Sequence, residues 1–337
     1  MNFFHHLNEN FVIFILYILY SILVIKYSIF FSKKLKIIDY PIDKRKIHKT
    51  ETPLVGFFYF SFTFFVILTW NLISNNFSLS FIFSLIFGLF FNTLVGLIDD
   101  RSSISANSRL ILIMIIFSIS LSLSENLVIQ AIETSLFQNT VILNSSFGFV
   151  FTIMCYMLLL NSLNLSDGIN GLAILITTIW LSIISFYADG FIVKMNFFLI
   201  INLLIIFFFN YKSKVFLGSG GVNFLATYIC FITVYTFNYS QYLSYEFIFL
   251  IFMIPGIDMM RVFCLRIFKG RNPFTPDKNH LHHYLINRLS LNKTLTIYFL
   301  LILIPLIIFI NFNNLIFYLI ALKCIFYFYL IKKLSFK

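Results

Sequence analysis

The chain is a series of long apolar stretches separated by short polar loops. A run of about 20 mostly apolar residues is long enough to cross a bilayer as a helix. The pattern predicts eleven such helices, near residues 11–31, 54–74, 78–98, 109–124, 141–160, 172–188, 195–210, 221–238, 245–257, 295–311 and 314–331. The first run is too long for a cleavable signal peptide and lacks a small-residue cleavage site, so we expect it to remain as a spanning helix. We therefore expect an all-α polytopic membrane protein, with residues 1–337 forming one integral-membrane domain.

The composition excludes a soluble globular protein. The chain is 60% hydrophobic and only 11% charged, whereas soluble domains average about 25% charged residues. Four cysteines lie far apart, without the spacing of a zinc site or a disulfide framework. The net charge of +11 would also suit a nucleic-acid-binding protein, but the basic residues lie in loops beside the apolar runs. That distribution is typical of topology control and of contact with membrane lipids, so we expect no nucleic-acid partner.

The Lys and Arg residues predict the orientation in the membrane. Loops 32–50 and 258–294 each hold seven of the 24, and more lie in 99–109, 211–220 and the tail after 331. With eleven spans, all five segments fall on one side, and excess Lys and Arg marks the cytoplasmic side. We therefore expect a periplasmic N-terminus and a cytoplasmic C-terminus. Lys323, inside the last predicted span, is tolerable if it faces protein or reaches the interface.

Two adjacent carboxylates, Asp99 and Asp100, end the third predicted span in the string GLIDDR. Acidic residues at a membrane edge lose hydration and repel each other unless a cation lies beside them. Such a pair suits Mg²⁺ binding or general base chemistry. The alternative is a charged helix end that only marks the membrane boundary.

The string NSLNLSDGING places Asn161, Asn164 and Asp167 at intervals of three. On a helix these side chains share one face, where amides and a carboxylate can bind phosphate oxygens, ribose or a hydrated metal. Gly168 and Gly171 would allow a close backbone approach or a turn. Capping of a helix end by Asn and Asp is the alternative explanation.

The densest ionisable cluster is PDKNHLHH, with Asn279, His280, His282 and His283. No cysteine lies nearby, so phosphate binding explains the histidines better than zinc does. A solvated polar loop remains the alternative. The string LGSGG around Ser219 has the glycines of a phosphate-cradling turn, although on its own it favours a simple loop. All these strings fall on the predicted cytoplasmic side.

Together the strings resemble the polyprenyl-phosphate N-acetylhexosamine-1-phosphate transferases, which are relatives of the phospho-MurNAc-pentapeptide translocase. The resemblance covers nearly the whole chain. It is carried by IDYPIDKRKIHKTETPLVG, GLIDDRSSISANSRL, NSLNLSDGINGLA and PGIDMMRVFCLRIFKGRNPFTPDKNHLHH, in that order. The NHLHH form is similar to the N-acetylhexosamine branch.

The resemblance implies a reaction at the cytoplasmic face of the bacterial inner membrane. A UDP-N-acetylhexosamine would transfer sugar-1-phosphate to undecaprenyl phosphate, giving undecaprenyl-diphosphate-sugar and UMP, and so begin a cell-surface polysaccharide such as lipopolysaccharide O-antigen. The implied cofactor is Mg²⁺, with Mn²⁺ as an alternative, and a homodimer is one oligomeric state that remains open.

The resemblance also implies roles for individual residues. Asp99 would assist the attacking lipid phosphate, and Asp100 would support the geometry of metal and diphosphate. Asp167 is the third implied catalytic residue, and with Asp100 it would bind the metal. The implied substrate-binding residues are Lys46, His48, Asn161, Asn164, Asn170, Asn279, His280, His282 and His283.

Two positions depart from the family's pattern. Asn170 stands where the family often has aspartate, and Ser219 in FLGSGGV stands where an FLGDSGS-like motif carries a metal-binding aspartate. A neutral hydroxyl is a weaker Mg²⁺ ligand than a carboxylate. An inactive paralogue that still binds lipid phosphate or nucleotide is therefore the alternative function. A transporter fits less well, because transporters place polar groups near the bilayer midplane, often within inverted repeats.

Overall fold

The computed structural model describes residues 11–41, 51–74, 77–134, 139–240, 243–275 and 277–335. The chain divides into two compact units. The first comprises residues 1–123 and 190–225, and the second comprises residues 124–189 and 226–337. Both are mainly helical, as the hydrophobic pattern predicts, and each also contains a short two-stranded antiparallel sheet that the sequence did not predict.

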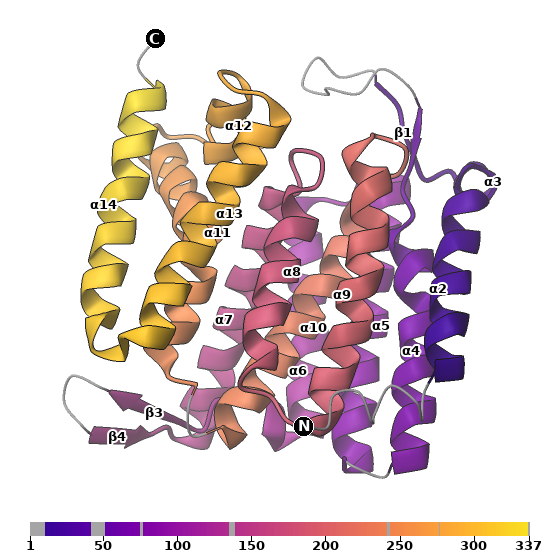
Figure 1. Ribbon diagram of the computed structural model, residues 1–337, viewed down its shortest axis with the longest axis horizontal. Helices are drawn as coiled ribbons and strands as arrows, with labels where there is room; N and C mark the ends of the chain where they lie inside the picture. The colour runs from indigo at the N-terminus through magenta and orange to yellow at the C-terminus, as the bar shows by residue number, and fades with distance from the viewer. Residues whose placement is uncertain are drawn as a thin grey trace. The chain divides into compact units, whose positions relative to one another are not determined.

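The first unit is a group of apolar helices packed side by side, as Figure 1 shows for α2, α4, α5 and α9. Its elements are α2 (Phe11–Lys26), α3 (Ser28–Leu35), β1 (Ile38–Asp39), β2 (Thr52–Pro53), α4 (Gly56–Ser74), α5 (Leu79–Ser102), α6 (Ala106–Leu123), α9 (Gly190–Tyr211) and the start of α10 (Gly218–Tyr239). Helix α5 begins where the Ser78 hydroxyl accepts the Phe81 amide hydrogen, which satisfies one of the unpaired donors of the first turn.

A short stretch of extended chain fixes where α10 begins. β1 pairs with β2, Ile38 opposite Pro53. Beyond β2, the amides of Val55 and Gly56 donate to the carbonyls of Phe216 and Leu217, both at 3.0 Å. The residues just before α10 are therefore held against the segment that leads into α4.

The second unit consists of the remaining elements. They are η1 (Glu125–Leu127), β3 (Ala131–Thr134), β4 (Asn139–Ile142), α7 (Ser145–Ser166), α8 (Leu172–Ser185), the rest of α10, α11 (Tyr245–Phe268), α12 (Leu281–Ile286), α13 (Leu291–Asn311), η2 (Asn313–Leu315) and α14 (Ile316–Ser335). Helices α13 and α14 lie side by side (Figure 1), and both contact α11. Side-chain caps mark helix starts here too, with Ser244 before α11 and Ser290 before α13.

A proline in the middle of α11 explains one buried contact. Pro255 has no amide hydrogen to donate to the Ile251 carbonyl, one helical turn earlier. The Trp180 indole donates to that carbonyl instead, at 3.0 Å. At the adjacent residue, the buried Lys323 ammonium donates to the Leu250 carbonyl, at 2.8 Å. Lys323 therefore faces protein, one of the two arrangements that would make it tolerable within a span.

A helix stands at each of the eleven predicted spans, but not all are equally long. Among the described residues, eight helices are long and apolar enough to cross a membrane, or up to nine if the bent pair Phe14–Lys26 and Ser28–Leu35 counts as one span. The apolar part of α4, Gly56–Thr69, and helix α8, Leu172–Ser185, are shorter. The protein is thus a multi-pass membrane protein, and the count of eleven stays a prediction.

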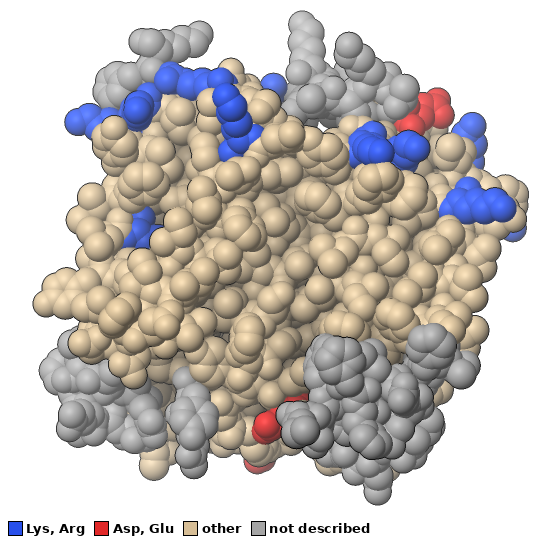
Figure 2. All heavy atoms as spheres, viewed as in Figure 1, with Lys and Arg blue, Asp and Glu red and all other residues tan. Residues whose placement is uncertain are grey.

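The outer faces of the helices suit a lipid environment. Large apolar side chains such as Phe83, Phe208 and Tyr318 are exposed on helix sides. In Figure 2 the sides of the helices are almost entirely tan. On the second unit, Lys and Arg gather at the end where α14 finishes, and on the first unit they gather at the end near α3 (Figures 1 and 2).

Candidate functional site

The carboxylate pair of the first unit lies in the last turn of α5. The Asp100 carboxylate accepts the amide hydrogen of Ser219 on Oδ1, at 2.7 Å, and that of Gly220 on Oδ2, at 3.1 Å. These amides belong to the first turn of α10, where backbone donors are unpaired and the helix dipole favours negative charge. Asp100 therefore caps α10 through Ser219, which lies 119 residues later in the chain.

Asp99 is held by three donors. Its Oδ2 accepts from Arg109 Nη1 at 2.9 Å and from the Ser219 hydroxyl at 3.2 Å, and its Oδ1 accepts from the Ile104 amide at 3.1 Å. Arg109 places a positive charge beside the two carboxylates, because it forms an ion pair with Asp99. The structure therefore brings Asp99, Asp100 and Ser219 together within the first unit.

The LGSGG string is neither a phosphate-cradling turn nor a simple loop, so both interpretations of it are wrong. Helix α10 begins at Gly218, and the amides that would cradle a phosphate already donate to Asp100. The glycines allow close packing instead. A methyl group at Gly96 would overlap the Ser219 carbonyl, and Gly56 and Gly221 contact each other in the same way.

In the second unit, the polar residues of NSLNLSDGING lie at the end of α7. Asn161 and Asn164 are in its last turns, Asp167 is its C-terminal cap, and all three are half-buried. The Asn161 amide donates to the Met157 carbonyl at 2.7 Å. Gly171 has a φ of 79° and ends the turn before α8, as predicted for a glycine at this position. Asn170, also half-buried, lies inside that turn.

The histidine segment, residues 277–283, packs against this turn. His280 precedes α12, and His282 and His283 lie in its first turn. His282 is buried, and a methyl group on Gly168 would overlap its Nε2. Gly168 therefore has no room for a side chain, because the His282 ring lies there. Two strings that are more than 100 residues apart meet within one unit.

Burial and neighbouring positive charge keep two of these histidines neutral. Burial, followed by the nearby His283, lowers the pKa of His282 well below its usual range. Burial, followed by His280 and Lys278, lowers the pKa of His283 to about 4. Neutral imidazoles can donate and accept hydrogen bonds but supply no fixed positive charge for a diphosphate.

The charged residues of the segment are arranged around an ion pair. Arg266 Nε donates to Asp277 Oδ2 at 2.9 Å. Burial opposes ionisation of Asp277, but the Arg266 contact and the Asn279 amide outweigh it and lower its pKa to about 2. The Asn279 side chain accepts from Tyr284 Oη at 3.2 Å. Lys278 is exposed, so it is free to meet an anionic substrate.

Some functional candidates were missed from the sequence. Asp258 on α11 is buried and pairs with His280, Arg261 and Tyr327. A signal was available, because Asp258 directly follows the predicted span 245–257, and an ionisable residue beside an apolar span is a functional candidate. Conversely, Lys46 and His48 fall outside the described residues.

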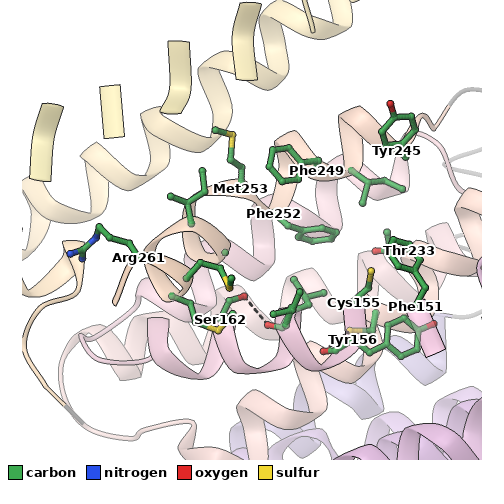
Figure 3. Close-up of a pocket in the computed structure, with 18 of the residues that line it drawn as sticks. Phe151, Cys155, Tyr156, Ser162, Thr233, Tyr245, Phe249, Phe252, Met253 and Arg261 are labelled. Carbon is green, nitrogen blue, oxygen red and sulfur yellow. Dashed lines mark hydrogen bonds between the residues drawn. The ribbon is translucent and has the colours of Figure 1, made fainter. Parts of the chain in front are cut away.

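A large apolar cavity lies within the second unit. It has a volume of about 730 Å³ and is lined by residues of α7, α10 and α11, among them Phe151, Phe249 and Met253. Figure 3 shows Arg261 and Ser162 toward one end and Tyr245 and Thr233 toward the other. Ser162 belongs to the NSLNLSDGING string, so one end of the cavity lies beside the polar residues described above.

The carboxylates can be tested as ligands of the predicted magnesium ion. Within the described part of the chain, no group of three or more His, Cys, Asp or Glu side chains could hold a metal. Asp99 and Asp100 nevertheless offer carboxylate oxygens, which are the ligands Mg²⁺ prefers. Mg²⁺ in enzymes commonly uses one or two carboxylates together with water and substrate phosphates. The residues present fit an ion held in that way, and not a cage made of protein alone.

Comparison with known proteins points in one direction. The family model described as "Glycosyl transferase family 4" matches residues 82–237, which include both carboxylates, Asp167 and Ser219. The undecaprenyl-phosphate alpha-N-acetylglucosaminyl 1-phosphate transferase of Thermotoga maritima is 30% identical over 273 residues, covering 79% of each chain. Proteins of the same name from Escherichia coli O157:H7 and Yersinia pestis are 27% and 26% identical over 207 residues. These two alignments cover 57% of this chain and 54% and 55% of the relatives, about half their length.

Proposed function

The chain belongs to glycosyl transferase family 4, and from this premise we propose that it transfers N-acetylhexosamine-1-phosphate from a UDP-sugar to undecaprenyl phosphate. The products are undecaprenyl-diphosphate-sugar and UMP. The coarser part, a sugar-phosphate transferase acting on a polyprenyl phosphate, is the activity named for its relatives. The UDP-linked donor, the bacterial inner membrane and the start of a cell-surface polysaccharide are the finer parts of the proposal.

The Asp99 and Asp100 cluster carries this proposal. Asp99 is the proton acceptor for the lipid phosphate, because its carboxylate lies at the end of α5 and already accepts a hydroxyl hydrogen from Ser219. Arg109 and the α10 N-terminus offset the negative charge of the pair. Asp100 holds the start of α10 in place. A bound Mg²⁺ would neutralise charge that develops on the transferred phosphate, with Asp99 and Asp100 as its candidate ligands in the first unit.

The second unit supplies features that suit both substrates. Its apolar cavity suits a polyprenyl tail, because the lining is almost wholly hydrocarbon and aromatic. The exposed Lys278 suits the diphosphate of the donor, and the half-buried His283 suits its nucleoside.

The test is Mg²⁺-dependent release of UMP in detergent, with undecaprenyl phosphate and a panel of UDP-N-acetylhexosamines. We expect lipid-dependent release by the wild type and its loss in Asp99→Asn. Asp189→Asn is the matched control, because Asp189 is an exposed aspartate in the loop between α8 and α9. Wild-type turnover in Asp99→Asn would remove Asp99 from the mechanism.

A second variant tests the lipid cavity. Gly256 lines the cavity, and a methyl group there meets no atom within 4 Å. Gly256→Leu therefore adds bulk to the cavity without a clash at its Cβ. We expect the KM for undecaprenyl phosphate to rise several-fold while the KM for the UDP-sugar stays unchanged. An unchanged lipid KM would mean that the tail binds elsewhere.

An inactive paralogue is the second candidate, and Ser219 favours it. The Ser219 hydroxyl donates to Asp99 in a position where family members carry an acidic residue. If the wild type releases no UMP but Ser219→Asp does, the chain is a decayed enzyme. If neither the wild type nor Ser219→Asp releases UMP, although both are folded and bind nucleotide, the result would support a binding role.

A further inference from the structure

The buried carboxylate of Asp258 has four hydrogen-bond partners. It is only 5% exposed, on α11. Its Oδ1 accepts from Tyr327 Oη at 2.6 Å, from Arg261 Nη2 at 3.0 Å and from the Leu281 amide at 3.1 Å. Its Oδ2 lies 2.8 Å from His280 Nδ1. A buried charge is tolerated only when it is paired in this way, so Asp258 fastens the histidine segment to α11 and α14.

Asp258 also determines which nitrogen of His280 is available. An ionised carboxylate is an acceptor only. The proton of His280 must therefore lie on Nδ1, and Nε2 is the remaining nitrogen. This Nε2 is buried and has no hydrogen-bond partner among the described residues, and the same is true of Nε2 of His282. The two rings lie parallel, with centroids 5.6 Å apart and planes 7° apart.

Two buried ring nitrogens in this segment, without a hydrogen-bond partner among the described residues, are candidates to bind a ligand. An unsatisfied buried polar atom is costly, and native proteins usually pair such atoms with a ligand, an ion or water. His280 is 3% exposed and His282 is 2% exposed, so neither ring has bulk water as its ready partner. His282 lies against Gly168 in the neighbouring turn, whereas His280 is anchored by Asp258.

We infer that Asp258 is a positioning residue, which with Tyr327 holds His280 so that its Nε2 accepts a hydrogen bond from a hydroxyl or N–H group of the nucleoside diphosphate donor. This inference rests on the proposed function, because it assigns a donor. The arrangement is carboxylate–imidazole–ligand, in which the carboxylate fixes the tautomer and the ring orientation. Arg261 completes the anchor by donating to the Asn279 carbonyl as well as to Asp258.

The first test is Asp258→Asn, which keeps the size but leaves a single acceptor oxygen in place of two. It cannot accept from Tyr327, Arg261 and His280 as the carboxylate does. We expect kcat/KM for the UDP-sugar to fall about 10- to 100-fold, as for other partners that orient a histidine, with the KM for undecaprenyl phosphate unchanged. Asp258→Glu restores the charge and should recover part of the loss.

A spectroscopic measurement separates positioning from simple stabilisation. In ¹⁵N-histidine-labelled protein, the His280 signals, assigned with His280→Gln, should show the proton on Nδ1 in the wild type. They should show loss of that form in Asp258→Asn. If Asp258→Asn lowers the Tm but leaves both the His280 signals and the donor KM as in the wild type, the role is structural only and the inference fails.

A milder variant keeps the test decisive if Asp258→Asn does not fold. Tyr327→Phe removes one hydrogen bond to Asp258, and Tyr329→Phe is the matched control, 54% exposed on the same helix. We expect donor kcat/KM to fall about 3- to 10-fold in Tyr327→Phe alone, as for the loss of one hydrogen bond. Equal activity in the two variants would overturn the inference. Absence of UMP release from the wild type would instead count against the proposed function, while the NMR test of His280 would still decide the positioning.

Discussion

The residue at position 219 determines how much negative charge lies beside Asp99 and Asp100. Its hydroxyl donates to Asp99 and its amide donates to Asp100, so the two carboxylates are satisfied without an ion. In Ser219→Asp a third carboxylate would stand beside them, and like charges at this distance repel by about 1 kcal/mol or more. We expect the Tm of this variant to fall by several degrees in EDTA and to recover with Mg²⁺.

The measurement is thermal unfolding in detergent over a Mg²⁺ titration. Ser219→Asn is the control, because it has a similar size to aspartate and no charge. If Ser219→Asp gains no more from Mg²⁺ than Ser219→Asn does, residue 219 does not face a metal, and the family's metal geometry does not apply here.

His283 makes the histidine segment sensitive to acid. Its pKa is about 4 in the folded protein and 6.5 in the unfolded chain, because burial, His280 and Lys278 all disfavour its charged form. Between these two values the unfolded chain binds a proton that the folded protein does not, so stability must fall as the pH is lowered from 6.5 to 4. Asp277 acts in a lower window. Its pKa of about 2 stabilises the fold above 3.8, and this contribution is lost as the pH falls toward 2.

His283→Gln separates these two windows. The variant removes the titrating imidazole and keeps hydrogen-bonding ability. We expect its Tm to depend less on pH than that of the wild type between pH 6.5 and 4, and to follow the wild type below that range. The measurement is Tm against pH for both proteins. Parallel curves from pH 6.5 to 4 would show that His283 does not contribute to acid sensitivity.

At the scale of single residues, the sequence predicted chemistry better than it predicted contacts. The polar strings drew attention to Asp99, Asp167 and the histidines, because carboxylates and imidazoles are rare among apolar runs. The sequence did not predict that Asp100 caps α10. The two amides that donate to Asp100 lie 119 and 120 positions away in the chain. Asp258 was missed for a related reason. Its partners Arg261 and His280 are near in sequence, but Tyr327 belongs to the last helix.

At the scale of elements, the turn at Gly168 joins α7 to the histidine segment. The ring of His282 occupies the space where a side chain on Gly168 would stand. We expect Gly168→Ala to displace His282, to lower donor kcat/KM at least 10-fold and to lower the Tm, because overpacking typically costs about 1–3 kcal/mol. Kinetics and thermal unfolding of the variant would measure both effects.

A double variant tests the contact directly. In Gly168→Ala with His282→Ala the overlap is gone, so the Tm should recover relative to Gly168→Ala alone. Gly256→Ala is the stability control, since its added methyl group meets no atom within 4 Å. Strictly additive effects of the two substitutions would mean that Gly168 and His282 do not interact.

The hydrophobic pattern located the helices well because apolar runs of this length have few alternative structures. Each predicted run contains a helix. Two helices begin at residues other than the predicted ones, because hydrogen bonds to their first turns fix where they start. Helix α7 begins later than predicted, after the β3–β4 pairing and the Asn144 cap. Helix α10 begins earlier, at Gly218, because the Asp100 carboxylate satisfies its first amides. Such contacts depend on neighbours far along the chain, which periodicity does not record.

At the scale of the whole molecule, the number of crossings decides which loops share a side. Helix α8 is 14 residues long, which is about 21 Å at 1.5 Å per residue. A hydrocarbon core is about 30 Å thick. If α8 nevertheless crosses, the eleven-span prediction puts Asp189 outside and Lys212 and Lys333 inside. If it does not, the loops on either side of it fall on the same side of the membrane.

Cysteine labelling of intact cells distinguishes these topologies in the full-length chain. Asp189→Cys, Lys212→Cys and Lys333→Cys place thiols at exposed positions, in a background where the native cysteines are replaced by Ser or Ala. We expect a membrane-impermeant maleimide to label only Asp189→Cys, because excess Lys and Arg keeps the other two loops cytoplasmic. A permeant maleimide should label all three and serves as the control. Labelling of Lys333→Cys from outside would reverse the predicted orientation, whereas protection of Asp189→Cys would show that α8 does not cross and that eleven spans are too many.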